Sequence, residues 1–230
     1  MSNKFESLEE IELKFRNSEI SNFPGYKHPP QFRPLDRSDS LKLSPILRKN
    51  SKSISTYLSK FSNSDKWGFK DANSFVLRLL RDQRFPSFHY VFTCGGEIVA
   101  LGSLVSYGED KDCCQVVLAV FGDHQGKGWG KVVAKTLIRI AFDIWGFDRL
   151  YWINDATNIA SSRLAQGIGC ELDAMYEDSH IMGDSGSGLW MRWVAYRPHE
   201  EMAPGVLQGA PIEYWVMPKS INLLEAKIKN

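Results

Sequence analysis

Apolar and β-branched residues gather in short runs in the middle of the chain, as they do in β-strands. Residues 88–94 and 97–106 form two such runs, and Gly95-Gly96 separates them. This pattern predicts a hairpin with a two-residue turn, which a strand at 113–121 continues. A further run predicts a strand at 149–154. The centre of the chain therefore predicts a β-sheet.

Other segments repeat their apolar residues every three or four positions, which is the period of an amphipathic helix. The clearest lies at 131–144, where Gly146 marks the end, and another helix opens at Asn158. Earlier helical patterns lie at 38–50, 52–62 and 71–83. Strand-like segments at 171–182 and 189–197 predict a closing hairpin across a glycine- and serine-rich turn. The order of elements predicts a mixed α/β (α+β) fold.

Composition is that of one globular domain with extensions at both ends. The chain has 230 residues, of which 43% are apolar and 24% charged, enough for a substantial core. We expect an N-terminal arm over 1–30 with one short amphipathic helix, a main domain over 31–197, and a C-terminal extension over 198–230.

Glycines are concentrated between the strand at 113–121 and the helix that follows it. The segment from Gly122 to Lys131 contains four of them. Glycine permits positive φ angles and close approach of a ligand, and a helix N-terminus offers unpaired N–H groups and partial positive charge. This corner therefore predicts a phosphate-binding loop.

The glycine spacing separates three known phosphate-binding patterns. A Walker loop needs Ser or Thr after Gly-Lys, but Val132 follows Lys131. A dinucleotide loop needs G-x-G-x-x-G and an acid at the end of the next strand, but Gly126, Gly128 and Gly130 give G-x-G-x-G. Asp148 lies at about the right distance for the acid, yet it begins the next apolar run rather than ending it. The pattern that remains is Gln125-x-x-Gly128-x-Gly130. It resembles the pyrophosphate loop of the GNAT superfamily of acyl-CoA-dependent N-acetyltransferases.

A second block makes the resemblance more specific. Residues 158–170, from Asn158 to Gly169-Cys170, are similar to the Asn-x-x-Ser stretch and terminal Gly-Phe of the RimJ/RimL-like branch, with Cys170 in place of Phe. Phe32-Arg33-Pro34-Leu35 resembles the first strand of the family. The resemblance covers about 31–197 and implies the GNAT fold, a mixed central sheet splayed between its fourth and fifth strands and flanked by helices.

The resemblance implies acetyl-CoA as the acyl donor and no metal. Its pyrophosphate would lie on backbone amides of the loop, and its pantetheine arm along the strand before it. The residues implied in cofactor binding are Leu118, Ala119, Val120, Gln125, Gly126, Lys127, Gly128, Trp129, Gly130, Lys131, Asn158 and Ser161. Replacement of Gly128 by valine is expected to abolish cofactor binding.

Asn158 and Ser161 allow two interpretations. Such residues are common at helix starts, where they cap backbone amides. The resemblance instead places both beside the thioester, with catalytic roles. Many GNAT enzymes carry a tyrosine seven residues after this asparagine as the suspected thiolate acid, but Ala165 stands here. Ser161 is the available substitute.

The general base is assigned to His180, on the strand that enters the closing hairpin. A histidine with an ordinary pKa of about 6.5 suits a base at neutral pH. The alternative is a surface or structural histidine, and Glu109, Asp178, His124 or a water chain are rivals for the role.

Four tryptophans and four cysteines are assigned mainly to the core. An acceptor pocket is the second interpretation of the tryptophans, and no cysteine pair has the spacing of a zinc site. They are Trp67, Trp152, Trp190, Trp193, Cys94, Cys113, Cys114 and Cys170.

The net charge and the hydropathy of the chain limit the classes of partner that we expect it to bind. A net charge of +1 argues against nucleic-acid binding as the main activity. No apolar run approaches the roughly 18 residues of a membrane span, and no secretory signal is visible at the N-terminus. We expect a cytoplasmic protein without membrane contact. A homodimer is one candidate assembly.

The expected reaction is direct acetyl transfer to a primary amine in a ternary complex. A protein N-terminal amine is the preferred acceptor, because the resembled branch acetylates such groups, and a small amine comes next. The alternative is a GNAT-fold acyl-CoA sensor or interaction module without turnover, since fold does not determine function. A nucleotide-binding protein is a third candidate.

Overall fold

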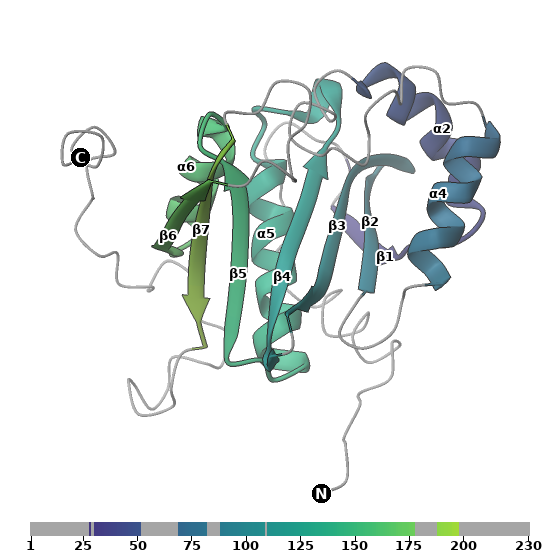
Figure 1. Cartoon of the computed structure of the whole chain (residues 1–230). Helices are drawn as coiled ribbons and strands as arrows, with labels where there is room; N and C mark the ends of the chain where they lie inside the picture. Colours follow the sequence, from purple (N-terminus) through teal and green to yellow (C-terminus); the bar gives the residue numbers. More distant parts are fainter. Residues whose placement is uncertain are drawn as a thin grey trace, which may run out of the picture.

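Seven strands form one mixed sheet with helices on both faces (Figure 1). The computed structural model describes residues 28, 30–51, 69–81, 88–108, 110–177 and 188–197. The elements are β1 (Gln31–Pro34), α2 (Asp39–Lys49), α4 (Phe69–Arg81), β2 (Phe88–Cys94), β3 (Glu97–Tyr107), β4 (Asp110–Val120), η3 (Gly122–His124), α5 (Trp129–Arg139), η4 (Ile140–Ile144), β5 (Arg149–Asp155), α6 (Ile159–Gly167), β6 (Glu171–Glu177) and β7 (Leu189–Tyr196). The expected arm over 1–30, the helix over 52–62, Trp67 and the extension over 198–230 fall wholly or almost wholly outside the described residues.

The sheet order is β1-β2-β3-β4-β5-β7-β6. All neighbouring strands are antiparallel except β4 and β5, which pair in parallel. The predicted meander and closing hairpin are both confirmed. The insertion of β7 between β5 and β6 places the last described strand in the interior of the sheet.

Helices α2 and α4 cover one face of the sheet and α5 covers the other. Adjacent strand residues point to opposite faces, so Val91 packs with α2 and α4 while Tyr90 and Phe92 pack on the α5 side. The predicted helix over 131–144 is present as α5 and its continuation η4, a π-helical turn in which the Trp145 amide donates to the Ile140 carbonyl at 3.0 Å.

The turn into α2 is held by side chains. Asp36 Oδ1 accepts hydrogen bonds from the amide and hydroxyl of Ser38 at 2.8 and 2.6 Å. Arg33 on β1 pairs through both guanidinium nitrogens with Asp39, which is only 1% exposed. This pair joins the first strand to the first described helix.

All four cysteines are free and buried, as predicted. Burial raises the pKa of the Cys114 and Cys170 thiols to about 12. Trp152, Trp190 and Trp193 are also buried. None of the described helices is both long enough and apolar enough to cross a membrane.

Candidate functional site: the fork between β4 and β5

The glycine loop follows directly from the carboxyl end of β4. Its backbone turns through η3 and enters the left-handed region at Gly126 and Gly128, with φ of 70° and 87°. Gly128 is the N-cap of α5, which begins at Trp129, two residues before the predicted start. Left-handed backbone at the cap is unfavourable for residues with a Cβ atom. Gly128 therefore has a conformational reason to be glycine.

Several amides of this loop lack a protein acceptor. Among the described residues, the N–H groups of Gly126, Lys127, Gly128 and Gly130 donate to no other group, whereas Lys131 donates to the Gly128 carbonyl at 3.0 Å. Gly126, Lys127 and Gly128 are exposed. Exposed amides at a helix N-terminus favour an anion, because the helix dipole adds positive potential there. The geometry supports the predicted phosphate-binding role of the loop.

Trp129 and Gly130 anchor the start of α5. The Trp129 side chain is fully buried in the core, so any part of this residue that meets a cofactor is its backbone. A Cβ atom on Gly130 would lie 3.0 Å from Leu164 Cδ2. The last glycine of the motif thus permits close packing of α6 on α5.

Gln125 ties the loop back to β4. Its Nε2 donates to the Val120 carbonyl at 2.9 Å. The first residue of the motif therefore stabilises the turn between β4 and the exposed amides of the glycine loop. This role is additional to any contact that Gln125 makes with a ligand.

Strands β4 and β5 separate part-way along their length. Parallel pairing joins Cys113–Val116 to Arg149–Trp152 and ends there. Among the described residues, β4 beyond Val116 pairs only with β3, and β5 beyond Trp152 pairs only with β7. We call this point the fork. Leu118, Ala119 and Val120 lie past it, so the edge of β4 that faces β5 has no ladder partner at the residues predicted to meet pantetheine.

The start of α6 meets the end of β5 beside the fork. Asn158 is the N-cap, and its Oδ1 accepts a hydrogen bond from the Ser161 amide at 3.1 Å. The capping interpretation of Asn158 is therefore confirmed. Ser161 Oγ accepts a hydrogen bond from Trp152 Nε1 at 2.8 Å. Ala165, at the position of the family's tyrosine, is fully buried.

A second and more deeply buried hydrogen-bond network lies next to the one that contains Trp152 and Ser161. Asn154 Oδ1 accepts from Trp193 Nε1 at 3.0 Å, and Asn154 Nδ2 donates to Ser162 Oγ at 2.9 Å. All three residues are at most 4% exposed. Sequence reasoning did not single out Asn154 or Ser162; the signal available was an asparagine at the end of the predicted strand at 149–154.

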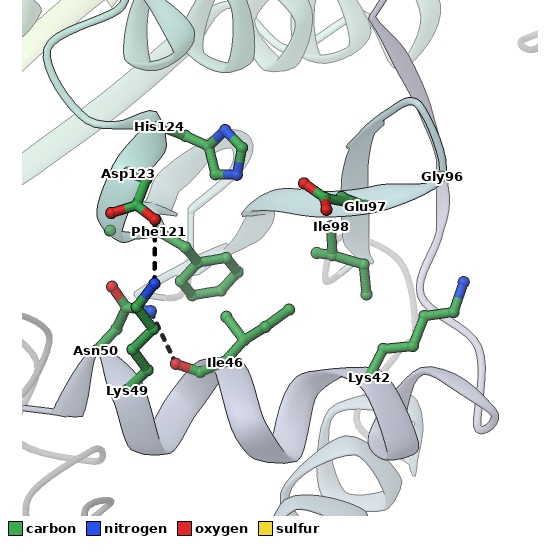
Figure 2. Close-up of a pocket in the computed structure, with 11 residues that line it drawn as sticks. Lys42, Ile46, Lys49, Asn50, Gly96, Glu97, Ile98, Phe121, Asp123 and His124 are labelled. Atoms are coloured by element: carbon green, nitrogen blue, oxygen red, sulfur yellow. Dashed lines mark hydrogen bonds and ion pairs between the residues drawn. The ribbon is translucent and has the colours of Figure 1, made fainter.

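Of the residues proposed for the general base, the described part of the chain contains His124. His180, Asp178 and Glu109 lie outside the described residues. His124 lines a cavity of about 440 Å³ between α2, the β2–β3 turn and η3 (Figure 2). Asp123 lies at the same cavity and pairs with Lys49 at 3.0 Å, which lowers the pKa of the Asp123 carboxyl. No lining residue of this cavity comes from β5 or α6, but Gly122, Asp123 and His124 belong to the beginning of the glycine loop.

The loop, the fork and the start of α6 together carry the features of one family of enzymes. The family model described as acetyltransferase (GNAT) family matches residues 55–169, half of the chain. The chain belongs to the GNAT family. This membership assigns it to the acetyl-CoA-dependent N-acetyltransferases.

Solved structures share the fold of this GNAT chain. RimL, the ribosomal L7/L12 alpha-N-protein acetyltransferase in complex with coenzyme A, has 15% identity and a TM-score of 0.66, over 76% of this chain and 97% of its own. RimJ of Mycobacterium smegmatis, in complex with CoA-disulfide, has 14% identity and a TM-score of 0.66, over 77% and 85%.

A small-amine enzyme is similar too. Spermidine N-acetyltransferase from Vibrio cholerae, in complex with CoA and spermine, has 14% identity and a TM-score of 0.61, over 73% of this chain and 95% of its own. At such identities the similarity establishes the fold alone. No curated protein sequence matches this chain.

Proposed function

We propose that this protein transfers an acetyl group from acetyl-CoA to a primary amine, with a protein N-terminal α-amine preferred and a small amine next. The observation that carries the proposal is that, among the described residues, the amides of Gly126, Lys127, Gly128 and Gly130 at the start of α5 have no acceptor, and that they lie beside the fork. The loop offers these donors to a diphosphate, and the fork offers an open strand edge to an extended amide-containing arm.

In this proposal the pyrophosphate lies on the loop from Gly126 to Lys131. The Lys131 amide already donates to the Gly128 carbonyl, so the contribution of Lys131 is the positive charge of its side chain. The pantetheine arm follows the backbone of Leu118, Ala119 and Val120. Asn158 and Ser161 then lie near the thioester. The exposure of the loop and the absence of a β5 partner along this part of β4 support this placement.

The preference for an α-amine rests on proton chemistry. Only a neutral amine attacks a thioester. An α-amine with a pKa near 7.7–8.0 is about a tenth or more neutral at pH 7, whereas a lysine near 10.4 is about a thousandth or less. The α-amine therefore needs less help from a base. The fold is shared with enzymes named for both acceptor classes.

His180 is the proposed base. The His180→Ala variant is expected to lose activity, and the acidic limb of the wild-type rate profile is expected to follow a group with a pKa near 6.5. His124→Ala is measured beside it, because His124 is a rival for the same role and lines the cavity between α2 and η3. Full activity of His180→Ala below pH 7 would assign the base elsewhere.

The experiment that tests the function measures CoA release with a panel of acceptors. The panel contains a peptide with a free N-terminus, the same peptide blocked at its N-terminus but carrying lysine, and spermine. We expect saturable CoA release with the free N-terminus. Initial rates at varied donor and acceptor should give intersecting reciprocal plots, as direct transfer in a ternary complex requires.

Two results would favour the other candidates. Saturable CoA binding without acceptor-dependent release would indicate a sensor or interaction module. Tighter binding of ATP or NAD than of CoA would indicate a nucleotide-binding protein.

We also propose the domain boundaries, the cellular location and the oligomeric state of the protein. We assign the transferase domain to 31–197, with the family match inside it. Free buried thiols at all four cysteines are typical of a reducing compartment, which supports the cytoplasm. Sedimentation analysis tests the candidate homodimer.

A further inference from the structure

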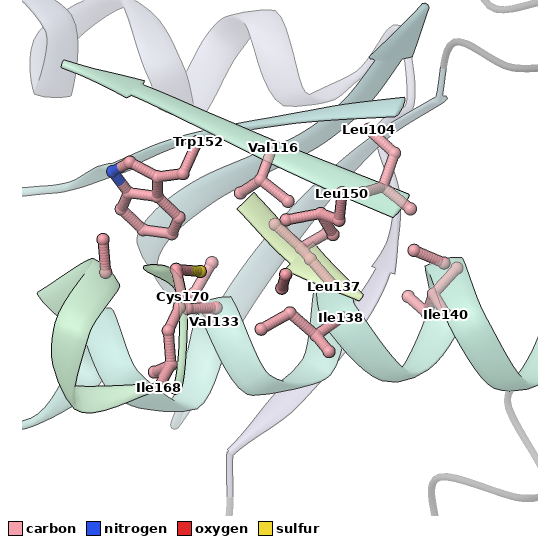
Figure 3. Packing of buried hydrophobic residues seen from close by; sticks show 14 of the residues in the cluster. Leu104, Val116, Val133, Leu137, Ile138, Ile140, Leu150, Trp152, Ile168 and Cys170 are labelled. Carbon is pink, nitrogen blue, oxygen red and sulfur yellow. The ribbon is translucent and has the colours of Figure 1, made fainter. Parts of the chain in front are cut away.

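Trp152 occupies the last paired position of β5 before the fork. Its register partner on β4 is Val116, and the parallel ladder stops after this pair. The indole is only 4% exposed and packs in the core near Val133 and Cys170 (Figure 3). The polar atom of this buried ring, Nε1, donates a hydrogen bond to Ser161 Oγ at 2.8 Å.

This hydrogen bond uses the Ser161 oxygen as an acceptor and leaves the hydroxyl hydrogen to donate to another group. Its Oγ accepts from Trp152, and its backbone amide donates to Asn158 Oδ1. Within the described part of the chain, no acceptor for the Ser161 hydroxyl hydrogen is present. Ser161 is partly exposed, so the hydroxyl hydrogen has access to a ligand at the fork.

An indole N–H is well suited to this role, because it is a donor only. A serine hydroxyl rotates and is both donor and acceptor. When one of its lone pairs accepts from a fixed N–H, the hydroxyl hydrogen is directed elsewhere. The accepted hydrogen bond also polarises the O–H bond and strengthens the bond that the hydroxyl donates.

We infer that Trp152 is a positioning residue that orients the Ser161 hydroxyl toward the sulfur of the leaving CoA. This inference rests on the proposed function. In the step concerned, the amine nitrogen bonds to the acetyl carbon and gives its proton to the base. The C–S bond breaks with its electron pair on sulfur, and Ser161 O–H donates a hydrogen bond to that charge.

Trp193 provides a matched control. It lies directly opposite Trp152 in the β5–β7 register, is 1% exposed, and also donates its indole N–H to a side-chain oxygen. That oxygen belongs to Asn154, whose network continues to the buried Ser162. Trp193→Phe therefore removes an indole hydrogen bond of the same kind, which is more deeply buried than that of Trp152, and removes no bond to Ser161.

The test is a double-mutant cycle with Trp152→Phe and Ser161→Ala, read as kcat, CoA dissociation constant and resistance to urea. We expect Trp152→Phe to lower kcat by about 2- to 12-fold, the value of one neutral hydrogen bond, with CoA affinity unchanged. Trp152→Phe should cause no further loss in a Ser161→Ala background. Trp193→Phe should lower urea resistance to a similar degree without changing kcat.

Each contrary result has its own meaning. If Trp152→Phe has the wild-type kcat while Ser161→Ala is slow, Trp152 has no positioning role. Ser161 then keeps its proposed role. Independent, multiplicative losses in the double variant also overturn the positioning role of Trp152. Wild-type kcat for Ser161→Ala removes Ser161 from the proposed function, and the inference fails with it.

A measurement on the unaltered protein covers the case in which Trp152→Phe does not fold. The chain has seven tryptophans. Their indole N–H resonances are assigned by through-bond correlation to the backbone, with Trp193→Phe as a check on Trp193, and are followed by nuclear magnetic resonance during titration with CoA. The Trp152 signal should move and the Trp193 signal should stay. An unmoved Trp152 signal at saturation overturns the inference.

Discussion

Replacement of Gly128 by valine tests the whole cofactor assignment at one backbone position. Gly128 caps α5 with φ of 87° and ψ of −6°. Valine is β-branched and disfavours this left-handed region more strongly than most residues. The variant must either hold a strained backbone or rotate out of the left-handed region and turn the neighbouring amides away.

Both routes have an estimable cost. Holding the left-handed conformation costs roughly 1–2 kcal/mol of stability for a residue with a Cβ atom. Rotating out of it removes amide hydrogen bonds to the diphosphate, each worth about 1.5–3 kcal/mol because the acceptor is charged. Loss of one such bond weakens CoA binding by about 10- to 150-fold, and loss of two or more abolishes measurable binding.

The assay is calorimetric titration with CoA beside urea unfolding, and Gly108→Val is the control. Gly108 has φ of 62° and, like Gly128, is exposed, and a Cβ atom there would meet nothing within 4 Å. It follows β3, away from the loop. We expect both variants to lose similar stability, but only Gly128→Val to lose CoA affinity.

Wild-type affinity in Gly128→Val would refute the assignment of the diphosphate to these amides. Equal weakening in both variants would show that reduced stability, and not the loop geometry, controls CoA binding.

Three further predictions follow from other contacts. Gln125→Leu removes the brace to the end of β4 and should weaken CoA binding by about 2- to 12-fold in calorimetry; unchanged affinity would show that the loop holds its shape without it. Arg33→Ala leaves the buried Asp39 carboxylate without its cationic partner, although the Asp36 amide still donates to it at 2.8 Å. The unfolding free energy in urea should fall by about 2 kcal/mol; a change below about 1 kcal/mol would contradict this. Burial raises the thiol pKa of Cys114 and Cys170 to about 12, so their stabilising effect is complete below about pH 9 and is lost as the pH rises toward 12. Urea unfolding at pH 10 should therefore give about 1–3 kcal/mol less stability than at pH 8, and equal stability would contradict the raised pKa values.

Much of the site was predictable because its signals are local. The Gln125-x-x-Gly128-x-Gly130 spacing predicts bare amides at a helix start, since glycine tolerates left-handed backbone and a first helical turn lacks internal acceptors. The cap at Asn158 is also local, because its partner Ser161 lies only three residues away. Such features depend on neighbouring dihedral angles alone.

The contacts of Trp152 were not predictable in this way. Its sequence pattern indicated a core tryptophan, and burial confirms that, but the direction of its Nε1 toward Ser161 depends on how α6 packs against β5. His180 lies outside the described residues, so its role as base stays a prediction.

The sequence by itself determined the order of elements, the phosphate-loop signature and the helix caps, because hydrophobic periodicity and backbone conformation depend on residues close in the chain. Only the tertiary structure decided that β7 enters the sheet between β5 and β6, and that parallel pairing stops after Val116 and Trp152. These outcomes depend on strand pairing between residues far apart in sequence and on how each helix covers the sheet. No local pattern specifies where two strands part, and the proposed chemistry lies at that point.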